Sequence, residues 1–453
     1  MTTTIQPRSA STQKIRILNA TWNMGDLSSF QKVDLRTTGT DWLVVTDKVD
    51  IVAIGLQECK VNENELRKWC LNKANYREFE VEAYVSVGDI RLILLVRKTL
   101  ARDGNLTAVS TDTVKTGIAN AVGNKGACGV SFQLFDATFA FVSAHLAAHQ
   151  EKSSDRADNY WRIVSNLKLG HNKFEVVNQF DFLFFMGDLN YRIEMDSAKE
   201  VMAMAQEGKF AELYKADQLR AAMAEGTVFH DFVESEPTFP PTYKYKVGTR
   251  EYTDKRIPSY TDRVLWKTFP GHSVSVLKHV DAPDVLLSDH SPVRCVVEVD
   301  APLTPTRQPP HRFTLKFSGL AASDLKVSDL ISGSSDPYLV FHTTRKAELG
   351  RTSVVKKSVN PEWPDVSFSF RRSILPEDIE ERHILVKVWD HDIGTTNDAI
   401  GSAVISLAGV AAGPVSFELN VIHSGKAAGK LRGTVELSAE LYSAQDNRKS
   451  MAV

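Results

Sequence analysis

The chain has 453 residues, of which 43% are hydrophobic and 24% charged, with a formal net charge of -2 at pH 7. This length suits about two or three domains, and the composition is that of a globular protein rather than a disordered one. A net charge so close to zero excludes a global field that would recruit nucleic acid or an acidic membrane, so such attraction must be local. The four cysteines are scattered without a CxxC pair, which favours reduced thiols over a disulfide framework.

No targeting or membrane-spanning segment is expected. The opening residues 1–7 are polar and lack the glycine that myristoylation requires. The longest apolar stretches, at 92–96 and 182–186, have the length of strands and fall well short of the roughly 20 residues that span a bilayer. We therefore expect a cytoplasmic protein whose membrane contact, if any, is peripheral.

Short apolar runs recur along the first two-thirds of the chain and end in polar or glycine-containing turns, as strands do. Helical patterns separate some of them, at 159–167 and 198–224. This mixture predicts an α/β layered domain over 14–300, preceded by a polar lead-in at 1–13 that we expect to be disordered. The expected strands are 15–18, 42–45, 51–56, 92–96, 129–135, 139–144 and 182–186.

The composition of the sequence changes at 301–312. This segment holds four of the 17 prolines, which predicts a semi-rigid linker. Beyond it, apolar and polar residues alternate with a period of two, and turns separate these runs with little helix between them. The pattern predicts an all-β sandwich over 313–442, followed by a polar tail at 443–453. The clearest alternating runs are 313–317, 366–370 and 384–389.

Oxygen-bearing side chains follow two of the apolar runs in the first domain. A phosphate monoester carries two negative charges, so its hydrolysis needs charge neutralisation, a positioned water and a stabilised leaving oxygen. Mg²⁺ supplies much of this with only one or two protein oxygens and several waters. Glu58, just after 51–56, is the best ligand candidate, and Asn23 offers a neutral second oxygen.

Asp188, at the end of the very apolar run 182–186, is the candidate to accept a proton from the attacking water. Asn190, two residues further on, points the same way if the strand persists, and is the candidate to donate to a phosphoryl oxygen. His145 closes another apolar run and is a second donor.

His290 is the natural cationic donor to the scissile phosphate. Asp262 is the candidate carboxylate that fixes its tautomer and raises its pKa. Asp289 is placed to reach the metal or its water. Each of these side chains alone fits an ordinary structural role, but their combination predicts a catalytic site.

These residues lie in strings that resemble a known family. Residues 14–300 resemble the catalytic domain of the inositol polyphosphate 5-phosphatases, within the Mg²⁺-dependent endonuclease/exonuclease/phosphatase superfamily. The resemblance implies a four-layered α/β sandwich of the DNase I-like type. It also implies removal of the 5-phosphate from phosphoinositides, such as phosphatidylinositol 4,5-bisphosphate or 3,4,5-trisphosphate, or from soluble inositol phosphates. The matching strings are WNMG at 22–25, GLQE at 55–58, GNKG at 123–126, AHLAAH at 144–149, FMGDLNYR at 185–192, PTYKY at 241–245, RIPSYTDR at 256–263 and SDHSP at 288–292.

Substrate choice is expected to depend on basic residues between Pro240 and Arg256. This stretch holds five cations against two acids, a net of +3, and suits a second ring phosphate. The resemblance implies that Tyr243 and Arg256 contact the 4-phosphate and that Lys125 lies near the 1-phosphate, whereas the alternative is a solvated basic loop. The complete set of predicted substrate-binding residues is Lys125, Arg192, Tyr243, Lys244, Lys255 and Arg256.

Acidic residues gather in two loops of the second domain. Asp390, Asp392 and Asp398 lie along one loop, and Asp329 and Asp336 bracket another. Five acids so close would repel one another unless cations neutralise them, and flexible oxygen-rich cages suit Ca²⁺. The region 313–442 resembles a C2 domain, which implies calcium-responsive membrane binding, although many such domains are protein docks. The matching strings are SDPY at 335–338, NPEW at 360–363 and WDHD at 389–392.

The sequence thus predicts a Mg²⁺-dependent phosphoinositide 5-phosphatase, without a nucleic-acid partner, that its C2 domain brings to a membrane. A 5-phosphatase acting mainly on soluble inositol phosphates is one alternative. A superfamily nuclease or sphingomyelinase is another, disfavoured by the absence of a broad basic face. A calcium-dependent adaptor with an inactive phosphatase fold is the third, and the intact Asp188, Asn190 and His290 argue against it.

Overall fold

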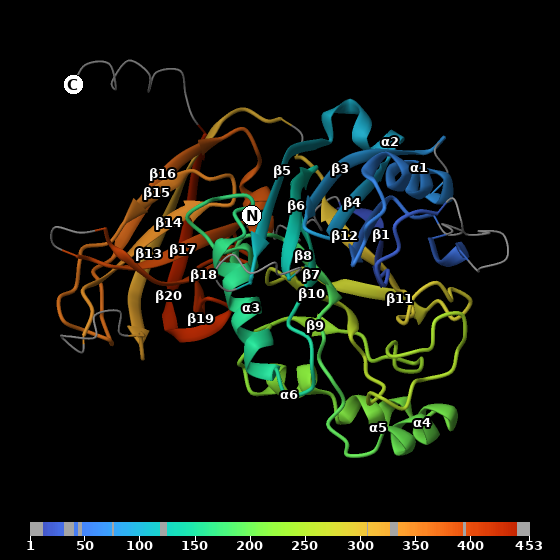
Figure 1. The fold of residues 1–453 in the computed structure, drawn as a ribbon. Helices are drawn as coiled ribbons and strands as arrows, with labels where there is room; N and C mark the ends of the chain where they lie inside the picture. Colours follow the sequence, from blue (N-terminus) through green and yellow to red (C-terminus); the bar gives the residue numbers. More distant parts are fainter. Residues whose placement is uncertain are drawn as a thin grey trace. The chain divides into compact units, whose positions relative to one another are not determined.

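A computed structural model describes residues 12–30, 40–43, 48–74, 77–117, 125–305, 307–326, 334–392 and 396–441 (Figure 1). The chain divides into two compact units. The first comprises Lys14–Thr268 and His272–Ala301, and the second takes in Phe269–Gly271 and the residues from Pro302 onward. No helix in the described part of the chain is long and apolar enough to cross a bilayer.

Two six-stranded sheets form the body of the first unit, in the orders β11-β12-β1-β2-β4-β3 and β5-β6-β7-β8-β10-β9. Two central pairs are parallel, β1 with β2 and β7 with β8. The pairs β11–β12, β2–β4, β4–β3, β5–β6, β6–β7, β8–β10 and β10–β9 are antiparallel. The first sheet consists of β1 Thr12–Asn23, β2 Ile51–Gln57, β3 Phe79–Val87, β4 Ile90–Arg97, β11 Val274–Asp281 and β12 Val293–Pro302. The second consists of β5 Leu106–Lys115, β6 Gly126–Leu134, β7 Ala137–His145, β8 Phe182–Asp188, β9 Val233–Glu234 and β10 Asp262–Thr268.

The helix predicted at 198–224 is wrong as a single element, because the structure has three short helices there. The first ends before Gly208, whose φ of +73° is a left-handed conformation that favours glycine and stops a helix. Asp217 caps the third by accepting hydrogen bonds from two backbone amides. The α-helices are α1 Glu63–Ala74, α2 Lys98–Ala101, α3 Ser153–Asn166, α4 Ala198–Gln206, α5 Phe210–Lys215 and α6 Gln218–Ala224, and the 3-10 helices are η1 Thr40–Leu43, η2 Arg102–Gly104 and η3 Val176–Asn178.

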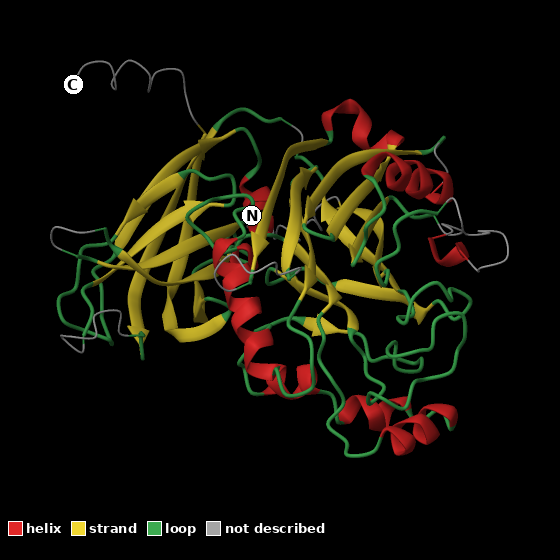
Figure 2. Ribbon diagram, viewed as in Figure 1, coloured by secondary structure: helices red, strands yellow, loops and turns green. Residues whose placement is uncertain are grey.

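The central strands are apolar throughout because both faces of each sheet are covered (Figure 2). Phe184 of β8 and Ala53 of β2 belong to one core that lies between the sheets. The next residues along these strands face outward: Phe185 packs in a core shared with α3, and Ile54 in a core shared with α1. Helix, sheet, sheet and helix therefore form four layers, which confirms the predicted α/β sandwich.

The second unit is an eight-stranded antiparallel sheet system, in the order β15-β14-β17-β18-β19-β20-β13-β16. Alternate side chains of its strands fill one hydrophobic core, as the period of two predicts. Strands β1, β12 and β13 each extend two residues into the predicted lead-in and linker. The unit contains β13 His311–Ser323, β14 Pro337–Thr343, β15 Glu348–Arg351, β16 Val366–Arg372, η4 Pro376–Glu381, β17 His383–Asp390, β18 Asp398–Ser406, β19 Val415–His423 and β20 Lys426–Leu441.

Candidate active site

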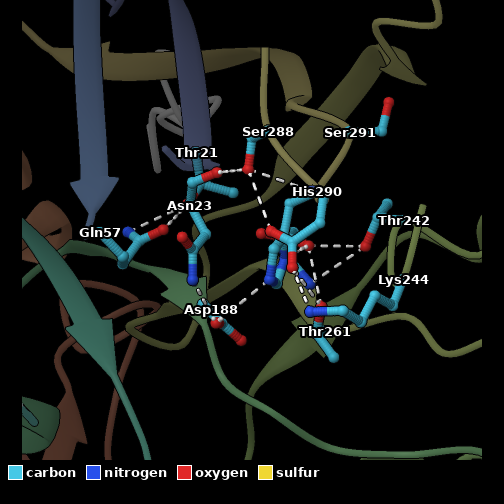
Figure 3. A network of polar contacts seen from close by, with 12 residues as sticks. Thr21, Asn23, Gln57, Asp188, Thr242, Lys244, Thr261, Ser288, His290 and Ser291 are labelled. Atoms are coloured by element: carbon cyan, nitrogen blue, oxygen red, sulfur yellow. Dashed lines mark hydrogen bonds and ion pairs between the residues drawn. The ribbon is translucent and has the colours of Figure 1, made fainter. Parts of the chain in front are cut away.

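The two parallel strand pairs of the first unit end in the predicted polar residues. Asn23 is the last residue of β1, and it pairs with Gln57 at the end of β2. His145 ends β7, and it pairs with Asp188 at the end of β8. Parallel strands present their carboxyl ends at the same edge of a sheet, so each pair delivers two polar side chains to one place. Figure 3 shows Asn23, Gln57 and Asp188 there.

Asp188 lies at the centre of the site and is 1% exposed. Its Oδ2 accepts a hydrogen bond from Asn23 Nδ2 at 2.9 Å and lies 3.1 Å from His145 Nε2, and its Oδ1 accepts one from the Asn190 amide at 3.1 Å. His290 Nε2 is 4.0 Å from the same Oδ2. Burial would raise the pKa of Asp188, but His145 and His290 outweigh it and hold the pKa below its ordinary value.

His290 and Asp262 form a buried pair, in which His290 Nδ1 lies 2.9 Å from Asp262 Oδ2. The hydroxyls of Thr242 and Thr261 donate to the same oxygen at 2.7 and 2.9 Å. Burial would lower the pKa of His290, but Asp262 and then Asp188 raise it to about 9. The imidazole is therefore held as a cation at neutral pH, as the sequence predicted for this pair.

The candidate metal ligands are Glu58, Asn23 and Asp289. Within the described part of the chain, the Glu58 carboxylate makes no hydrogen bond or ion pair, and it lies close enough to Lys125 and Lys244 to interact with their charges. Among the described residues, Asn23 Oδ1 accepts only the Gly25 amide, at 3.0 Å, which leaves one lone pair for a further partner. An open carboxylate beside an amide oxygen is a donor set that fits a hard divalent cation such as Mg²⁺.

Asp289 has a partner that the sequence did not predict. Its Oδ2 lies 2.5 Å from Lys244 Nζ. Burial would raise the pKa of Asp289, but His290 and Lys244 lower it, so the carboxylate stays ionised. The pairing places one of the predicted substrate cations, Lys244, beside the candidate metal ligands rather than apart from them.

Asn190 does not point into the site as an extended strand would place it. Strand β8 ends at Asp188, and Asn190 has a left-handed φ of +57°. Its Oδ1 accepts a hydrogen bond from Arg192 at 2.6 Å, and its Nδ2 donates to the Leu146 carbonyl at 3.2 Å. One amide hydrogen remains, so its donation to a phosphoryl oxygen stays a prediction.

Arg192 and Tyr243, both predicted to bind substrate, are stacked together. The Arg192 guanidinium lies 4.7 Å from the centroid of the Tyr243 ring. The Tyr243 ring in turn lies 4.5 Å from the His290 ring. The Tyr243 ring therefore contacts both a guanidinium and the His290 imidazole.

Lys125 contacts His145 Nε2 and is half-buried. Burial lowers the pKa of Lys125, and Asp188 opposes this shift. His145 Nδ1 is buried without a hydrogen-bond partner among the described residues, and burial also lowers the pKa of this imidazole. Beside Lys125 a cleft runs along α3, where Arg162 and Asn159 line it.

Three of the five cations between Pro240 and Arg256 are paired with acids. They are Lys244 with Asp289, Lys246 with Glu251 and Arg250 with Asp281. Lys255 and Arg256 are exposed and make no ion pair with another described residue. These two side chains are therefore the ones whose charge is most available to a substrate phosphate.

Ser288 joins two parts of the site and was not singled out in the sequence. Its hydroxyl donates to the Asn23 carbonyl at 2.7 Å and accepts from the His290 amide at 3.1 Å. The adjacent pair Gln57 and Thr21 is buried, and Gln57 Nε2 donates to Ser143 at 3.2 Å. Only the position of Ser288 in the SDHSP string pointed to this role.

In the second unit, the structure links four of the predicted calcium ligands through strand pairing and backbone hydrogen bonds. The Asp336 amide donates to Asp390 Oδ1 at 2.6 Å, and Asp390 pairs with Asp398 across β17 and β18. Asp392 Oδ2 accepts the Asp398 amide at 3.2 Å. Asp329 lies outside the described residues. Among the acids that are described in these loops, no three have their ligand atoms within 4.8 Å of one another.

Comparisons with known proteins match both units. Residues 20–296 match the model of Endonuclease/Exonuclease/phosphatase family 2, and residues 313–420 match that of the C2 domain. Phosphatidylinositol 3,4,5-trisphosphate 5-phosphatase 2 of Homo sapiens is 29% identical over 93% of this chain, which spans 36% of that protein. Phosphatidylinositol 3,4,5-trisphosphate 5-phosphatase 1 of Xenopus laevis is 30% identical over 87% of this chain, which spans 41% of it.

Solved structures resemble the first unit. The inositol polyphosphate 5-phosphatase domain of a synaptojanin, in complex with inositol (1,4)-bisphosphate and a calcium ion, is 27% identical with a TM-score of 0.56. The match covers 64% of this chain and 86% of that domain. A Cimex nitrophorin has a TM-score of 0.52 at 21% identity over 63% of this chain and 99% of its own, which shows the fold alone. These matches confirm the resemblances drawn from the sequence.

Proposed function

The chain belongs to endonuclease/exonuclease/phosphatase family 2, and on that premise we propose that it hydrolyses the 5-phosphate of phosphoinositides with the help of Mg²⁺. One observation carries the proposal: an ionised Asp188 and a cationic His290 lie 4.0 Å apart, next to the Tyr243–Lys244 pair. A base and an acid at this spacing can serve a water and a phosphoryl oxygen at once. The names of the curated relatives support the choice of substrate.

Asp188 is the acceptor for the proton of the attacking water. A carboxylate with a lowered pKa is ionised throughout the neutral range, but it is a weak base. It therefore orients the water through a hydrogen bond and takes its proton as the new oxygen–phosphorus bond forms. The bond between phosphorus and the inositol 5-oxygen breaks at the same time, and this oxygen leaves as the alcohol after taking a proton from solvent. Asn23 and His145 hold the carboxylate in this orientation.

His290 donates from Nε2 to the phosphoryl group, because its Nδ1 is engaged by Asp262. The imidazolium neutralises charge that develops on the phosphoryl oxygens. When bound by Glu58 and Asn23, Mg²⁺ would acidify the water and neutralise further phosphoryl charge. We assign the second ring phosphate to Tyr243, Lys244 and Arg256, with the Lys244 ammonium shared between Asp289 and the phosphate.

The second unit is proposed to bring the enzyme to a membrane surface in response to Ca²⁺. Asp336, Asp390 and Asp398 lie together at one end of the sandwich, and their mutual repulsion falls when a cation binds. The backbone amide of Lys357 donates to Asp336 Oδ1 at 2.8 Å, so basic residues border the acidic loops. We therefore propose peripheral association with anionic lipid.

Phosphate release from liposomes tests this function directly. Liposomes would carry phosphatidylinositol 4,5-bisphosphate or 3,4,5-trisphosphate, with Mg²⁺, with and without micromolar Ca²⁺, beside an Asp188→Ala control. Release that needs Mg²⁺ and rises with Ca²⁺ is the expected result. Phosphate release from soluble inositol phosphates but not from liposomes would show that the substrates are soluble inositol phosphates. Nicking of plasmid DNA would show that the enzyme is a nuclease. No release above Asp188→Ala from any of these would contradict the proposal.

A further inference from the structure

Three consecutive residues, Thr242 to Lys244, are clamped between two other segments of the active site. On one side, Tyr243 exchanges backbone hydrogen bonds with Ser259, at 2.8 and 3.2 Å. On the other side, the Ser291 amide donates to the Thr242 carbonyl at 2.8 Å, and Tyr243 bridges to His290. The segment is therefore a short strand fixed along both edges.

Each residue of this segment contacts a different titratable residue of the site; Figure 3 labels two of the three, Thr242 and Lys244. The Thr242 hydroxyl donates to Asp262 Oδ2 at 2.7 Å. The Tyr243 ring lies 4.5 Å from the His290 ring. Lys244 Nζ lies 2.5 Å from Asp289 Oδ2. The segment that is assigned to the second ring phosphate thus also forms part of the catalytic residues' environment.

Asp262 receives all its hydrogen bonds on one oxygen. His290 Nδ1, Thr242 and Thr261 all lie within 2.9 Å of Oδ2, whereas Oδ1 is buried without a partner among the described residues. Two hydroxyls therefore fix the rotation of the carboxylate, and the carboxylate fixes the imidazole. Thr242 also accepts the Asp262 amide at 3.4 Å, so it contacts both the backbone and the side chain.

Resting on the proposed function, we propose that Thr242 is a positioning residue that couples the binding of a second ring phosphate to the Asp262–His290 pair. A phosphate held by Tyr243 and Lys244 pulls on the segment to which Thr242 belongs. Because hydrogen bonds hold this backbone on both sides, the segment moves as a unit, and the shift reaches the Thr242 hydroxyl and thereby the carboxylate that orients His290. The enzyme then turns over substrates with the second phosphate faster, and does not merely bind them more tightly.

Thr261 supplies a matched control. Both threonines are 0% exposed, and both donate to Asp262 Oδ2. Thr261 Oγ1 also lies 3.3 Å from His290 Nδ1, so the comparison rests on the substrate preference and not on the size of the loss in kcat. Thr261 immediately precedes β10, outside the 242–244 segment. If the two threonines act only through hydrogen bonds to Asp262, Thr242→Val and Thr261→Val must have the same substrate preference. If Thr242 couples phosphate binding to Asp262, the two variants must differ in substrate preference.

The experiment compares kcat and KM for phosphatidylinositol 4,5-bisphosphate and phosphatidylinositol 5-phosphate in mixed micelles with Mg²⁺. We expect Thr242→Val to lower kcat on the bisphosphate about 10- to 100-fold, the loss typical of one hydrogen bond to a charged group. Its KM should change less than about threefold, and its kcat preference for the bisphosphate should shrink about tenfold. Thr242→Ser should restore both, and Thr261→Val should lower kcat on both lipids equally and keep the preference.

Equal losses on the two lipids in Thr242→Val and Thr261→Val would overturn the coupling. The Asp262→Asn double variant is a second test, since Thr242→Val must add little on that background if it acts through Asp262. A melting-temperature scan checks folding, and Thr242→Ala takes the place of the valine variant if that one unfolds. Wild-type protein that is inactive on both lipids would instead refute the proposed function, an outcome distinct from a lost preference.

Discussion

Asn23 Nδ2 donates to Asp188 Oδ2 over 2.9 Å, and the two residues end strands of different sheets. β1 lies within the first sheet and β8 within the second. The bond thus ties the sheets together at the point where the water is proposed to be activated. Ser288 reinforces the same junction through the Asn23 carbonyl.

Asn23→Ala removes both the donor to Asp188 and one proposed metal oxygen. We expect kcat to fall about 100-fold or more, because an orienting hydrogen bond to a charged group is lost along with a ligand. The affinity for Mg²⁺, measured by titration calorimetry without substrate, should weaken about tenfold.

Asn19→Ala is the control, since Asn19 is also buried in β1 but makes no side-chain hydrogen bond within the described residues. Truncating such a group should leave Mg²⁺ binding and kcat nearly unchanged. Similar losses in the Asn19 and Asn23 variants would contradict the assignment.

The pH dependence follows from His290. Its pKa is raised to about 9, so the imidazolium persists at neutral pH, and kcat/KM should fall as the pH rises through about 9. In Asp262→Asn the largest raising cause is gone, so this alkaline limb should move to lower pH. A profile of kcat/KM from pH 6 to 10 measures the shift, and an unmoved limb would refute the role of Asp262.

The same shift has a consequence for stability. The folded-state pKa of His290 lies above the ordinary 6.5, so protonation favours the folded state. The contribution is complete below about pH 6.5 and is lost as the pH rises through about 9. The wild type should therefore melt at a higher temperature than Asp262→Asn at pH 6.5, and this difference in melting temperature should shrink as the pH rises to about 9.

The sequence predicted the residues of this site better than their geometry. Asn23 and Asp188 follow apolar runs, and the ends of parallel strands meet, so their approach was foreseeable. The orientation of Asn190 was not, because the alternation rule holds only while the strand persists. A left-handed residue turns its amide toward Arg192 instead.

Contacts between distant segments were beyond any local pattern. Thr242 reaches Asp262 only because two segments are hydrogen-bonded side by side at Tyr243 and Ser259. The pairing of Lys244 with Asp289 also joins segments that are distant in the sequence. Asp289 partly neutralises a positive charge that the sequence predicted to be available to the substrate. The layered fold, by contrast, follows from the lengths and spacing of apolar runs, which are local properties.

Arg263 forms a buried ion network next to Asp262. Its Nε donates to Glu234 at 2.6 Å and its side chain to Asp217 at 2.9 Å, and all three side chains are at most 3% exposed. Arg263→Met leaves two buried carboxylates without their cation, which costs about 3–5 kcal/mol of stability. A drop in the melting temperature of the unit's transition measures this loss.

The comparison for that variant is Arg67→Met, which breaks an exposed i,i+4 pair with Glu63. Such a surface pair contributes about 0.5 kcal/mol, so the melting temperature should barely change. If both variants lowered the melting temperature by the same amount, the buried network would contribute no more to stability than the surface pair.

Asp390→Asn tests the calcium proposal without touching the proposed catalytic residues. Asp390 is buried and central among the acids, so removing its charge lowers the field that attracts Ca²⁺ and removes one oxygen donor of the right charge. Co-sedimentation with anionic liposomes at micromolar Ca²⁺ should fall about tenfold relative to the wild type. Hydrolysis of soluble substrates should be unaffected.

Asp365→Asn separates this effect from a general loss of negative charge. Asp365 is exposed in the same unit, where it pairs with Lys316 at 3.5 Å and is absent from the acidic loops. Its loss should leave calcium-dependent sedimentation unchanged, because a screened surface pair contributes little. If a calcium chelator left the sedimentation of the wild type unchanged, the proposed role of calcium would be refuted. In that case the Asp336–Asp390 contact would serve only to hold the ends of two strands together.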